Sequence, residues 1–367
     1  MTAPTATTAP KRSAPIRFFE IDGMRGFGAT MVILAHMNAK PLFWAWVFMD
    51  MFFVVSSLLI TRIVIKQVVN LRGLLAFWGR RIERIWPLYL LTVWALLLLS
   101  LALSPANPDR AYQIEQFWRY FTFSQYSELL YTDSPMYKDI YFIRHLWSLA
   151  VEEQFYILLP ILVLALRYLP RPLWIVLLLA TIPLAVHERL VNTHMVLISN
   201  HIDAFALGSL MALGMSWMEA NKARVNWLLG VLFLAGLAGF LPYVFENYHA
   251  SVAGLEIDKY EPWAATAGIY MAVAWISLLA INRNARILAP LRWPPLVYLG
   301  VISYPLYLVH FPITSLFPKY LPALFAKLGL AQTPFLLVQA AMLFTSVLLA
   351  HILYKLIDQR LQAGRKA

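Results

Sequence analysis

The chain has 367 residues, of which 60% are hydrophobic and 13% are charged, and its formal net charge is +11. A soluble domain of this length cannot bury so much apolar surface, so lipid is the main solvent of this protein. The sequence contains no cysteine, which excludes disulfides, thiolate zinc sites and a cysteine nucleophile.

The apolar segments predict an all-α, polytopic membrane bundle. Backbone groups in lipid must hydrogen-bond within their own segment, so long apolar runs indicate helices, whereas a barrel shows short alternating stretches. Residues 1–17 are rich in Thr, Ala and Pro and predict a disordered cytoplasmic tail rather than a signal peptide. The membrane domain is expected at 18–358, a cytoplasmic tail at 359–367, and no additional soluble domain.

Ten segments have the length and apolar character of membrane spans, with nine or eleven as alternative counts. They are 21–38, 42–63, 86–103, 146–166, 172–187, 201–218, 226–245, 263–281, 295–316 and 333–355.

The Lys and Arg residues predict how this bundle is oriented. With a cytoplasmic N-terminus, 20 of them lie on the inner side, nine lie outside and Arg25 lies within the first span. Inner loops of polytopic proteins are enriched in Lys and Arg, so both termini are expected in the cytoplasm, at a bacterial inner membrane. Topology accounts for most of the basic charge, so nucleic acid is not an expected partner.

The first span contains two ionisable side chains, Arg25 and His36, eleven residues apart. Eleven residues make about three helical turns, so both side chains point to the same face, roughly 16 Å apart along the axis. An ionisable residue within a span marks a functional site by default, because the bilayer penalises it. The alternative is that Arg25 reaches the inner interface and His36 lies among the outer headgroups.

An arginine cluster directly precedes the third span, in FWGRRIERIWPLY. Arg84 follows Arg80 by four residues and Arg81 by three, so one helix face can present two or three guanidinium groups. Arginine binds phosphate through paired hydrogen bonds, which predicts an anion site on the cytoplasmic side. The alternative is a topology signal that contacts lipid headgroups.

Further polar side chains within the spans predict an enclosed polar cavity. Adjacent carboxylates stand in the fourth span and histidines in three other places, an arrangement that serves either catalysis or transport. The residues are Asp50, His145, Glu152, Glu153, Asp203, Ser303, Tyr307 and His310.

Arg25 with the arginine cluster at the inner end, and His36 at the outer end, match an elongated donor. Acyl-coenzyme A has phosphates at one end, a flexible arm, and a reactive thioester at the other end. An acceptor hydroxyl attacks a thioester poorly unless a base removes its proton, and histidine, with a pKa of about 6.5 in water, suits that task. We therefore expect His36 to be the general base or a transient acyl acceptor, oriented by Glu152 or Asp50.

Six stretches resemble the acyltransferase family 3 of integral-membrane O-acyltransferases. IDGMRGFGATMVILAH, which contains Arg25 and His36, is similar to the opening motif of the family, and MDMFFVVSSLL is similar to its second element. Ser57 stands in that element where the family usually has glycine. RRIERIWPLY, HLWSLAVEEQFYILLP, ISYPLYLVHFP and YKLIDQR follow in the family's order, the last with Asp358 where glutamate is more usual.

The resemblance implies an acyl-coenzyme A co-substrate, typically acetyl-coenzyme A, and a hydroxyl acceptor on a carbohydrate or glycoside. The expected donor-binding residues are Arg25, Arg80, Arg81 and Arg84, of which Arg25, Arg81 and Arg84 match the family's motifs, and no metal or tightly bound cofactor is expected. The acceptor or cavity residues are then His145, Glu153, Ser303, Tyr307 and His310. A transporter or flippase of a glycan or lipid-linked substrate is the alternative function, and it predicts no binding of coenzyme A. A passive structural protein leaves the adjacent Glu152 and Glu153 unexplained.

Overall fold

The computed structural model describes residues 18–37, 40–103, 114, 117–125, 141–191, 196–253, 261–327 and 335–359. The described part is almost entirely helical and contains no strand, which confirms the all-α prediction. The expected N-terminal tail lies outside the described residues, as does the expected C-terminal tail beyond Gln359.

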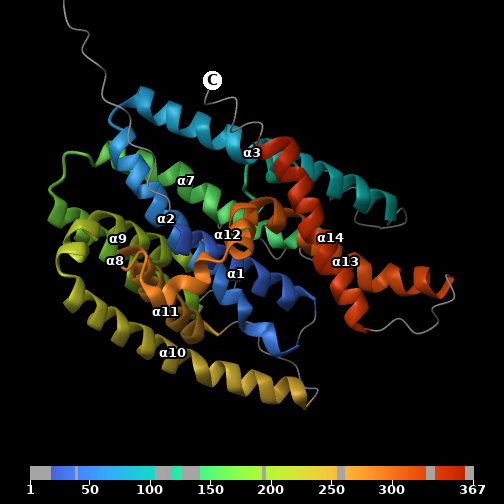
Figure 1. The fold of residues 1–367 in the computed structure, drawn as a ribbon. Helices are drawn as coiled ribbons and strands as arrows, with labels where there is room; N and C mark the ends of the chain where they lie inside the picture. The colour runs from blue at the N-terminus through green and yellow to red at the C-terminus, as the bar shows by residue number, and fades with distance from the viewer. Residues whose placement is uncertain are drawn as a thin grey trace, which may run out of the picture.

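Ten helices of at least 18 residues run through the described part of the chain (Figure 1). They are α1 (Phe19–His36), α2 (Val47–Gln67), α3 (Leu71–Leu103), α7 (Trp147–Ala165), α8 (Arg171–Val191), α9 (Ile202–Ala220), α10 (Lys222–Val252), α11 (Pro262–Ile281), α13 (Ser303–Lys327) and α14 (Phe335–Leu353). The shorter elements are η1 (Lys40–Trp46), α5 (Trp118–Phe121), η2 (Tyr141–Leu146), η3 (Ile198–His201), η4 (Arg286–Arg292), α12 (Pro294–Val301) and η5 (Tyr354–Asp358).

Seven of the described helices are long and apolar enough to cross a membrane, or eight if the bent pair α12 and α13 counts as one span. The two other long helices, α1 and α9, contain the polar side chains expected within spans, such as Arg25 and Asp203. Both pack inside the bundle, α1 against α12 and α9 against α2. Surrounding helices thus shield the polar groups that lower the hydropathy of α1 and α9.

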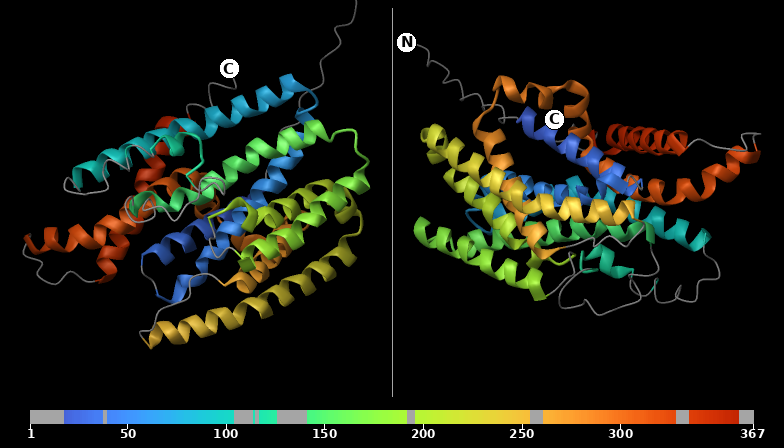
Figure 2. Two further views of the ribbon diagram at one scale, coloured as in Figure 1. Left: turned by 180° about the vertical axis from the view of Figure 1, so that it is seen from behind. Right: turned by 90° about the horizontal axis from the view of Figure 1, so that it is seen from below.

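The outer helices α3 and α10 lie on opposite edges of the bundle, with α1 between them (Figures 1 and 2). Helix α10 packs on α11, and α13 packs on both α1 and α14. The predicted span 295–316 is not one straight helix, because the chain bends by 79° between α12 and α13. This bend places Ser303 at the first residue of α13.

Glycines allow α1 and α12 to approach each other closely. A Cβ atom on Gly26 would lie 2.0 Å from the carbonyl oxygen of Leu296. A Cβ atom on Gly300 would lie 1.8 Å from the carbonyl oxygen of Asp22. Real Cβ atoms do not approach oxygen so closely, so only glycine fits at these two crossing points.

Buried polar contacts also fix the start of α1. Glu20 is 2% exposed and accepts hydrogen bonds from the backbone N–H of Asn284 and from Nη1 of Arg292, each at 2.9 Å. Together with the glycine contacts, these bonds determine where Arg25 lies relative to α13.

The same kind of close contact joins α2 to α9. Position 57 of α2 is serine, and the glycine at this crossing point is Gly208 of α9. A Cβ atom on Gly208 would lie 1.8 Å from Oγ of Ser57. Ser57 is fully buried, and its hydroxyl donates to the carbonyl oxygen of Val54 at 3.0 Å. Close packing at this point therefore depends on Gly208.

We expect Gly300→Ala to lower the thermal unfolding midpoint of the purified protein, because overpacking costs about 1–3 kcal/mol. Gly230→Ala is the matched control, since no neighbouring atom lies within 4 Å of a Cβ built there. Thermal unfolding of both variants in the same detergent measures the difference. Equal midpoints for the Gly300 and Gly230 variants would contradict the packing role of Gly300.

Candidate active site

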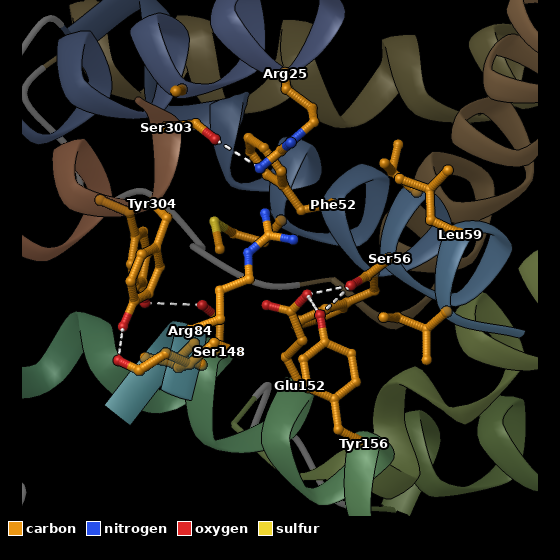
Figure 3. A pocket seen from close by; sticks show the side chains of 18 of the residues that line it. Arg25, Phe52, Ser56, Leu59, Arg84, Ser148, Glu152, Tyr156, Ser303 and Tyr304 are labelled. Atoms are coloured by element: carbon orange, nitrogen blue, oxygen red, sulfur yellow. Dashed lines mark hydrogen bonds between the residues drawn. The ribbon is translucent and has the colours of Figure 1, made fainter. Parts of the chain in front are cut away.

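A cavity of about 620 Å³ lies among α1, α2, α3, α7 and α13. Its volume falls in the range of small-molecule binding sites. Side chains from all five helices line it, and Figure 3 shows ten of these residues by name.

The cavity carries an excess of positive charge. Five cationic side chains line it, and Glu152 is the only carboxylate among the described residues of the lining. Arg25 donates from Nη2 to Oγ of Ser303 at 2.8 Å, and Arg84 points into the space between Arg25 and Glu152 (Figure 3). An anion is therefore the ligand favoured by charge. The cations are Arg25, Arg62, Lys66, Arg81 and Arg84.

The three arginines before the third span do not act as one group. Arg81 and Arg84 line the cavity, and the guanidinium carbon of Arg81 lies 5.9 Å from the centre of the Tyr156 ring. Arg80 is absent from the lining and donates to Oε1 of Gln67 at 2.5 Å. The expectation that Arg80 contacts the donor directly is thus not supported by its position.

The two adjacent glutamates of α7 have different surroundings. Glu152 lines the cavity, and its Oε1 accepts hydrogen bonds from the hydroxyls of Ser56 and Tyr156 (Figure 3). Glu153 is buried outside the lining, next to Nε1 of Trp86 at 3.5 Å. Of the pair, only Glu152 is placed to contact a molecule in this cavity.

Tyr307 and His310 line the cavity on α13 and connect it to other residues predicted for the site. The Tyr307 hydroxyl donates to the carbonyl oxygen of His145 and lies 2.8 Å from Oγ of Ser148. The ring centres of His145 and His310 are 5.4 Å apart. His145 itself is buried behind this wall and donates from Nε2 to the carbonyl oxygen of Leu308 at 3.3 Å.

His36 lies beside His310, with 5.2 Å between the ring centres. Nδ1 of His310 lies 2.7 Å from the carbonyl oxygen of Tyr307, so Nδ1 bears the hydrogen and Nε2 of the neutral ring is an acceptor. Nδ1 of His36 lies 2.9 Å from the carbonyl oxygen of Val32 and 3.3 Å from that Nε2. These contacts assign the hydrogen of His36 to Nδ1 and leave a lone pair on its Nε2, which forms no hydrogen bond with the described residues.

Comparison with known proteins places this chain among membrane acyltransferases. The family model described as an acyltransferase domain matches residues 18–355. The chain belongs to acyltransferase family 3. It is 26% identical over 321 residues to the O-acetyltransferase OatA of Staphylococcus aureus strain NCTC 8325, a match that covers 82% of this chain and 51% of OatA. OatA of strain COL gives the same values.

The chain spans about half the length of these OatA relatives. No solved structure matches this acyltransferase. The family assignment agrees with the order of the motifs along the sequence, and the cavity above brings five of those motifs together. Its lining includes Arg25, Ser56, Arg84, Glu152 and His310.

Asp50 lies apart from His36 in this acyltransferase. Its Oδ1 accepts a hydrogen bond from Nδ1 of His201 at 2.6 Å, and both side chains are buried. Glu152 is hydrogen-bonded to Ser56 and Tyr156, and the polar side chain that contacts the His36 ring is His310 rather than either carboxylate expected to orient it. Sequence reasoning did not single out His201, although HID at 201–203 places it two residues before Asp203.

A second buried pair lies close to His201 in the chain. Nη1 and Nη2 of Arg189 donate to the two carboxylate oxygens of Asp203 at 3.0 and 2.6 Å, and both residues are completely buried. Arg189 also donates to the carbonyl oxygen of Asn200 and to Oγ1 of Thr266. Neither member of this pair lines the cavity, which indicates a structural role for the pair.

Within the described residues, no three His, Asp or Glu side chains are arranged to hold a metal ion. The ring of His310 contacts the rings of both His36 and His145, as aromatic neighbours do.

Proposed function

We propose that this chain is a membrane O-acyltransferase that moves an acyl group, acetyl above all, from acyl-coenzyme A to a hydroxyl of a carbohydrate or glycoside. The observation that carries the proposal is a cavity lined by five cations that extends to His310, the neighbour of His36. Membership of acyltransferase family 3 and the similarity to OatA, an O-acetyltransferase by name, support the same reaction.

The charges of the cavity fit the donor at one end. Arg81, Arg84, Arg62 and Lys66 would hold the phosphates and the nucleotide, since guanidinium groups bind phosphate oxygens in pairs. Arg25, held by Ser303, would contact the arm of the donor. The thioester would then lie at the end of the cavity formed by Ser148, Tyr307 and His310.

The histidine geometry suits proton transfer at the other end. The lone pair on Nε2 of His36 would accept the hydrogen of the acceptor hydroxyl as its oxygen attacks the thioester carbonyl. The C–S bond then breaks, and the proton on Nε2 passes to the leaving thiolate. The Nδ1–H of the transient imidazolium remains hydrogen-bonded to Val32 and lies next to Nε2 of His310, which supplies a lone pair where other enzymes use a carboxylate.

The same proposal places the protein in a bacterial inner membrane with its arginine-rich end towards the cytoplasm. Acyl-coenzyme A is a cytoplasmic metabolite, and the excess of Lys and Arg on one side of the spans gives the same orientation. No metal and no resident cofactor are needed, because every step uses side chains of the chain and the two substrates.

Binding of acetyl-coenzyme A to the detergent-purified protein tests this function. We expect Arg84→Gln to weaken binding roughly tenfold to 100-fold, because a charged partner of the phosphates is lost. Arg80→Gln is the matched control, since Arg80 belongs to the same helix but does not line the cavity. Titration calorimetry gives both affinities.

A wild-type protein that does not bind acetyl-coenzyme A would contradict the proposal and favour the transporter alternative. Equal weakening by Arg80→Gln and Arg84→Gln would show that general positive charge, rather than the cavity, attracts the donor.

A further inference from the structure

A second cavity, of about 570 Å³, lies on the other side of α2 from the first. Ile63 and Lys66 of α2 face the first cavity, whereas Thr61, Ile65 and Val68 face the second. Both cavities therefore reach the end of the bundle where α2 terminates. The proposed acyl transfer does not use the second cavity.

The walls of the second cavity are apolar for most of their extent. They come from α2, α7, α8 and α9, together with the connection between α7 and α8. The two hydroxyls in the wall, those of Thr61 and Ser209, hydrogen-bond each other at 2.8 Å and so do not call for a polar ligand. The apolar lining consists of Ile65, Val68, Val69, Leu159, Val163, Leu169, Trp174, Leu178 and Leu213.

Two exposed guanidinium groups, those of Arg167 and Arg171, complete the lining. Arg167 donates to the carbonyl oxygen of Val69 and to the hydroxyl of Tyr168. Arginine has five N–H donors, so these two bonds leave donors for a further acceptor. No carboxylate stands among the described residues that line this cavity, so its charge is positive.

The cavity lies at the boundary between protein and lipid. Helix α8 forms one of its walls, and only 11% of the apolar window of α8 is buried within the protein. A ligand that reaches the cavity from the bilayer has apolar chains. A free inorganic anion has no interaction with the apolar walls and leaves them unfilled.

From this combination of an apolar cavity with two cations beside it, we propose that the second cavity binds an anionic phospholipid. The phosphate contacts Arg167 and Arg171, and one acyl chain lies along Leu159, Val163 and Leu178. Guanidinium groups hydrogen-bond phosphate oxygens. The bound acyl chain covers the apolar wall of the cavity, which would otherwise face the mobile lipids around the protein.

Lipid retention in native mass spectrometry tests this site. The purified, delipidated protein is mixed with palmitoyl-oleoyl-phosphatidylglycerol or with the corresponding phosphatidylcholine. We expect one phosphatidylglycerol to remain bound at lipid concentrations that give no retained phosphatidylcholine. The double variant Arg167→Gln/Arg171→Gln is expected to weaken this retention roughly 30-fold.

Matched variants separate the headgroup from the chain. Lys222→Gln/Arg224→Gln removes two exposed cations elsewhere on the surface and is expected to retain the lipid. Val163→Trp leaves both arginines in place but fills the cavity, and it is expected to lose the lipid. If the double arginine variant does not fold, as judged by circular dichroism, Arg171→Gln alone and Val163→Trp still provide the test.

Several outcomes would overturn the proposal. Equal retention of the two lipids, or full retention by the arginine variants, would show that the guanidinium groups do not bind the headgroup. Full retention by Val163→Trp, or displacement of the lipid by millimolar inorganic phosphate, would show that the chain does not occupy the cavity. Failure of acetyl-coenzyme A to bind leaves this proposal unaffected, because the two cavities have different linings.

Discussion

Alanine at position 36 is expected to reduce kcat for acyl transfer by about 10²–10⁴-fold and to leave the affinity for acetyl-coenzyme A nearly unchanged. The ring of His36 contacts His310 and Phe311, and its Nε2 has a lone pair that no described residue uses. His36 is absent from the lining of the cavity, so the bound donor retains its arginine contacts when the imidazole is removed. Only proton transfer in the transition state is lost.

The control for this prediction is His187→Ala, because His187 is an exposed histidine on α8 and lines neither cavity. Acyl transfer to a carbohydrate acceptor and titration with acetyl-coenzyme A are measured on the same folded preparations. Full turnover in the His36 variant would exclude both the base and the acyl-acceptor roles. A large loss of donor affinity with unchanged kcat would instead assign His36 to donor binding.

The apolar pattern of the sequence predicts most of the fold. Each of the ten predicted spans contains a long helix, and 263–281 differs by only one residue from α11 (Pro262–Ile281). Span boundaries can be predicted this closely because, in lipid, every backbone N–H and C=O must be hydrogen-bonded within its own helix. The start of the third helix is less accurate: α3 begins at Leu71 rather than at 86, since its arginine-rich first half is helical but not apolar.

The break between α12 and α13 has a signal in the local sequence, but the direction of α12 does not. Pro305 has no N–H to donate to the carbonyl oxygen of Val301, the last residue of α12, and its ring would clash with that carbonyl, so a straight helix cannot continue across Ile302. The contact of Gly300 with α1 shows that the direction of α12 is determined by packing between segments far apart in the chain. Such packing leaves no periodic signal in one sequence.

The candidate site is predicted in its residue types but not in all of its pairings. Arg81 and Arg84, which the sequence places on the same side of the membrane as Arg25, line one cavity with it. The sequence analysis expects Glu152 or Asp50 to orient His36, because each lies in the outer half of a neighbouring predicted span. The structure pairs His36 with His310, 274 residues further along the chain, a contact that depends on the angle between α1 and α13.

The charge pattern gave no indication that Arg189 is buried. The excess of Lys and Arg on the inner side is a rule about loops; because the predicted fifth span ends at residue 187, Arg189 counts as one of the nine residues outside, in the loop that follows. In the structure Arg189 lies in the last turn of α8 and is completely buried, with Asp203 of α9 as its partner. A rule that counts charges cannot identify a pair formed between two helices, so this buried, two-bond ion pair is visible only in the structure.

Removing one member of this pair is expected to be among the most destabilising changes in the protein. Asp203→Ala removes the carboxylate that neutralises the buried guanidinium of Arg189, and breaking a buried pair in this way costs about 3–5 kcal/mol. The control is Glu219→Ala, which breaks the pair with Arg283 at 3.0 Å; its partners are 34% and 44% exposed, and such pairs contribute about 0–1 kcal/mol.

The thermal unfolding midpoint in detergent measures the loss of stability in both variants. A double variant then tests the cause of the larger loss. If the cost of Asp203→Ala comes from the uncompensated charge, the double variant Arg189→Leu/Asp203→Ala regains much of the lost stability, because no buried charge remains. A double variant that is less stable than Asp203→Ala would show instead that Arg189 stabilises the bundle mainly through Asn200 and Thr266. Equal midpoints for Asp203→Ala and Glu219→Ala would contradict burial of the Arg189–Asp203 pair. Equal losses of stability would mean that water reaches the Asp203 and Glu219 carboxylates to a similar extent.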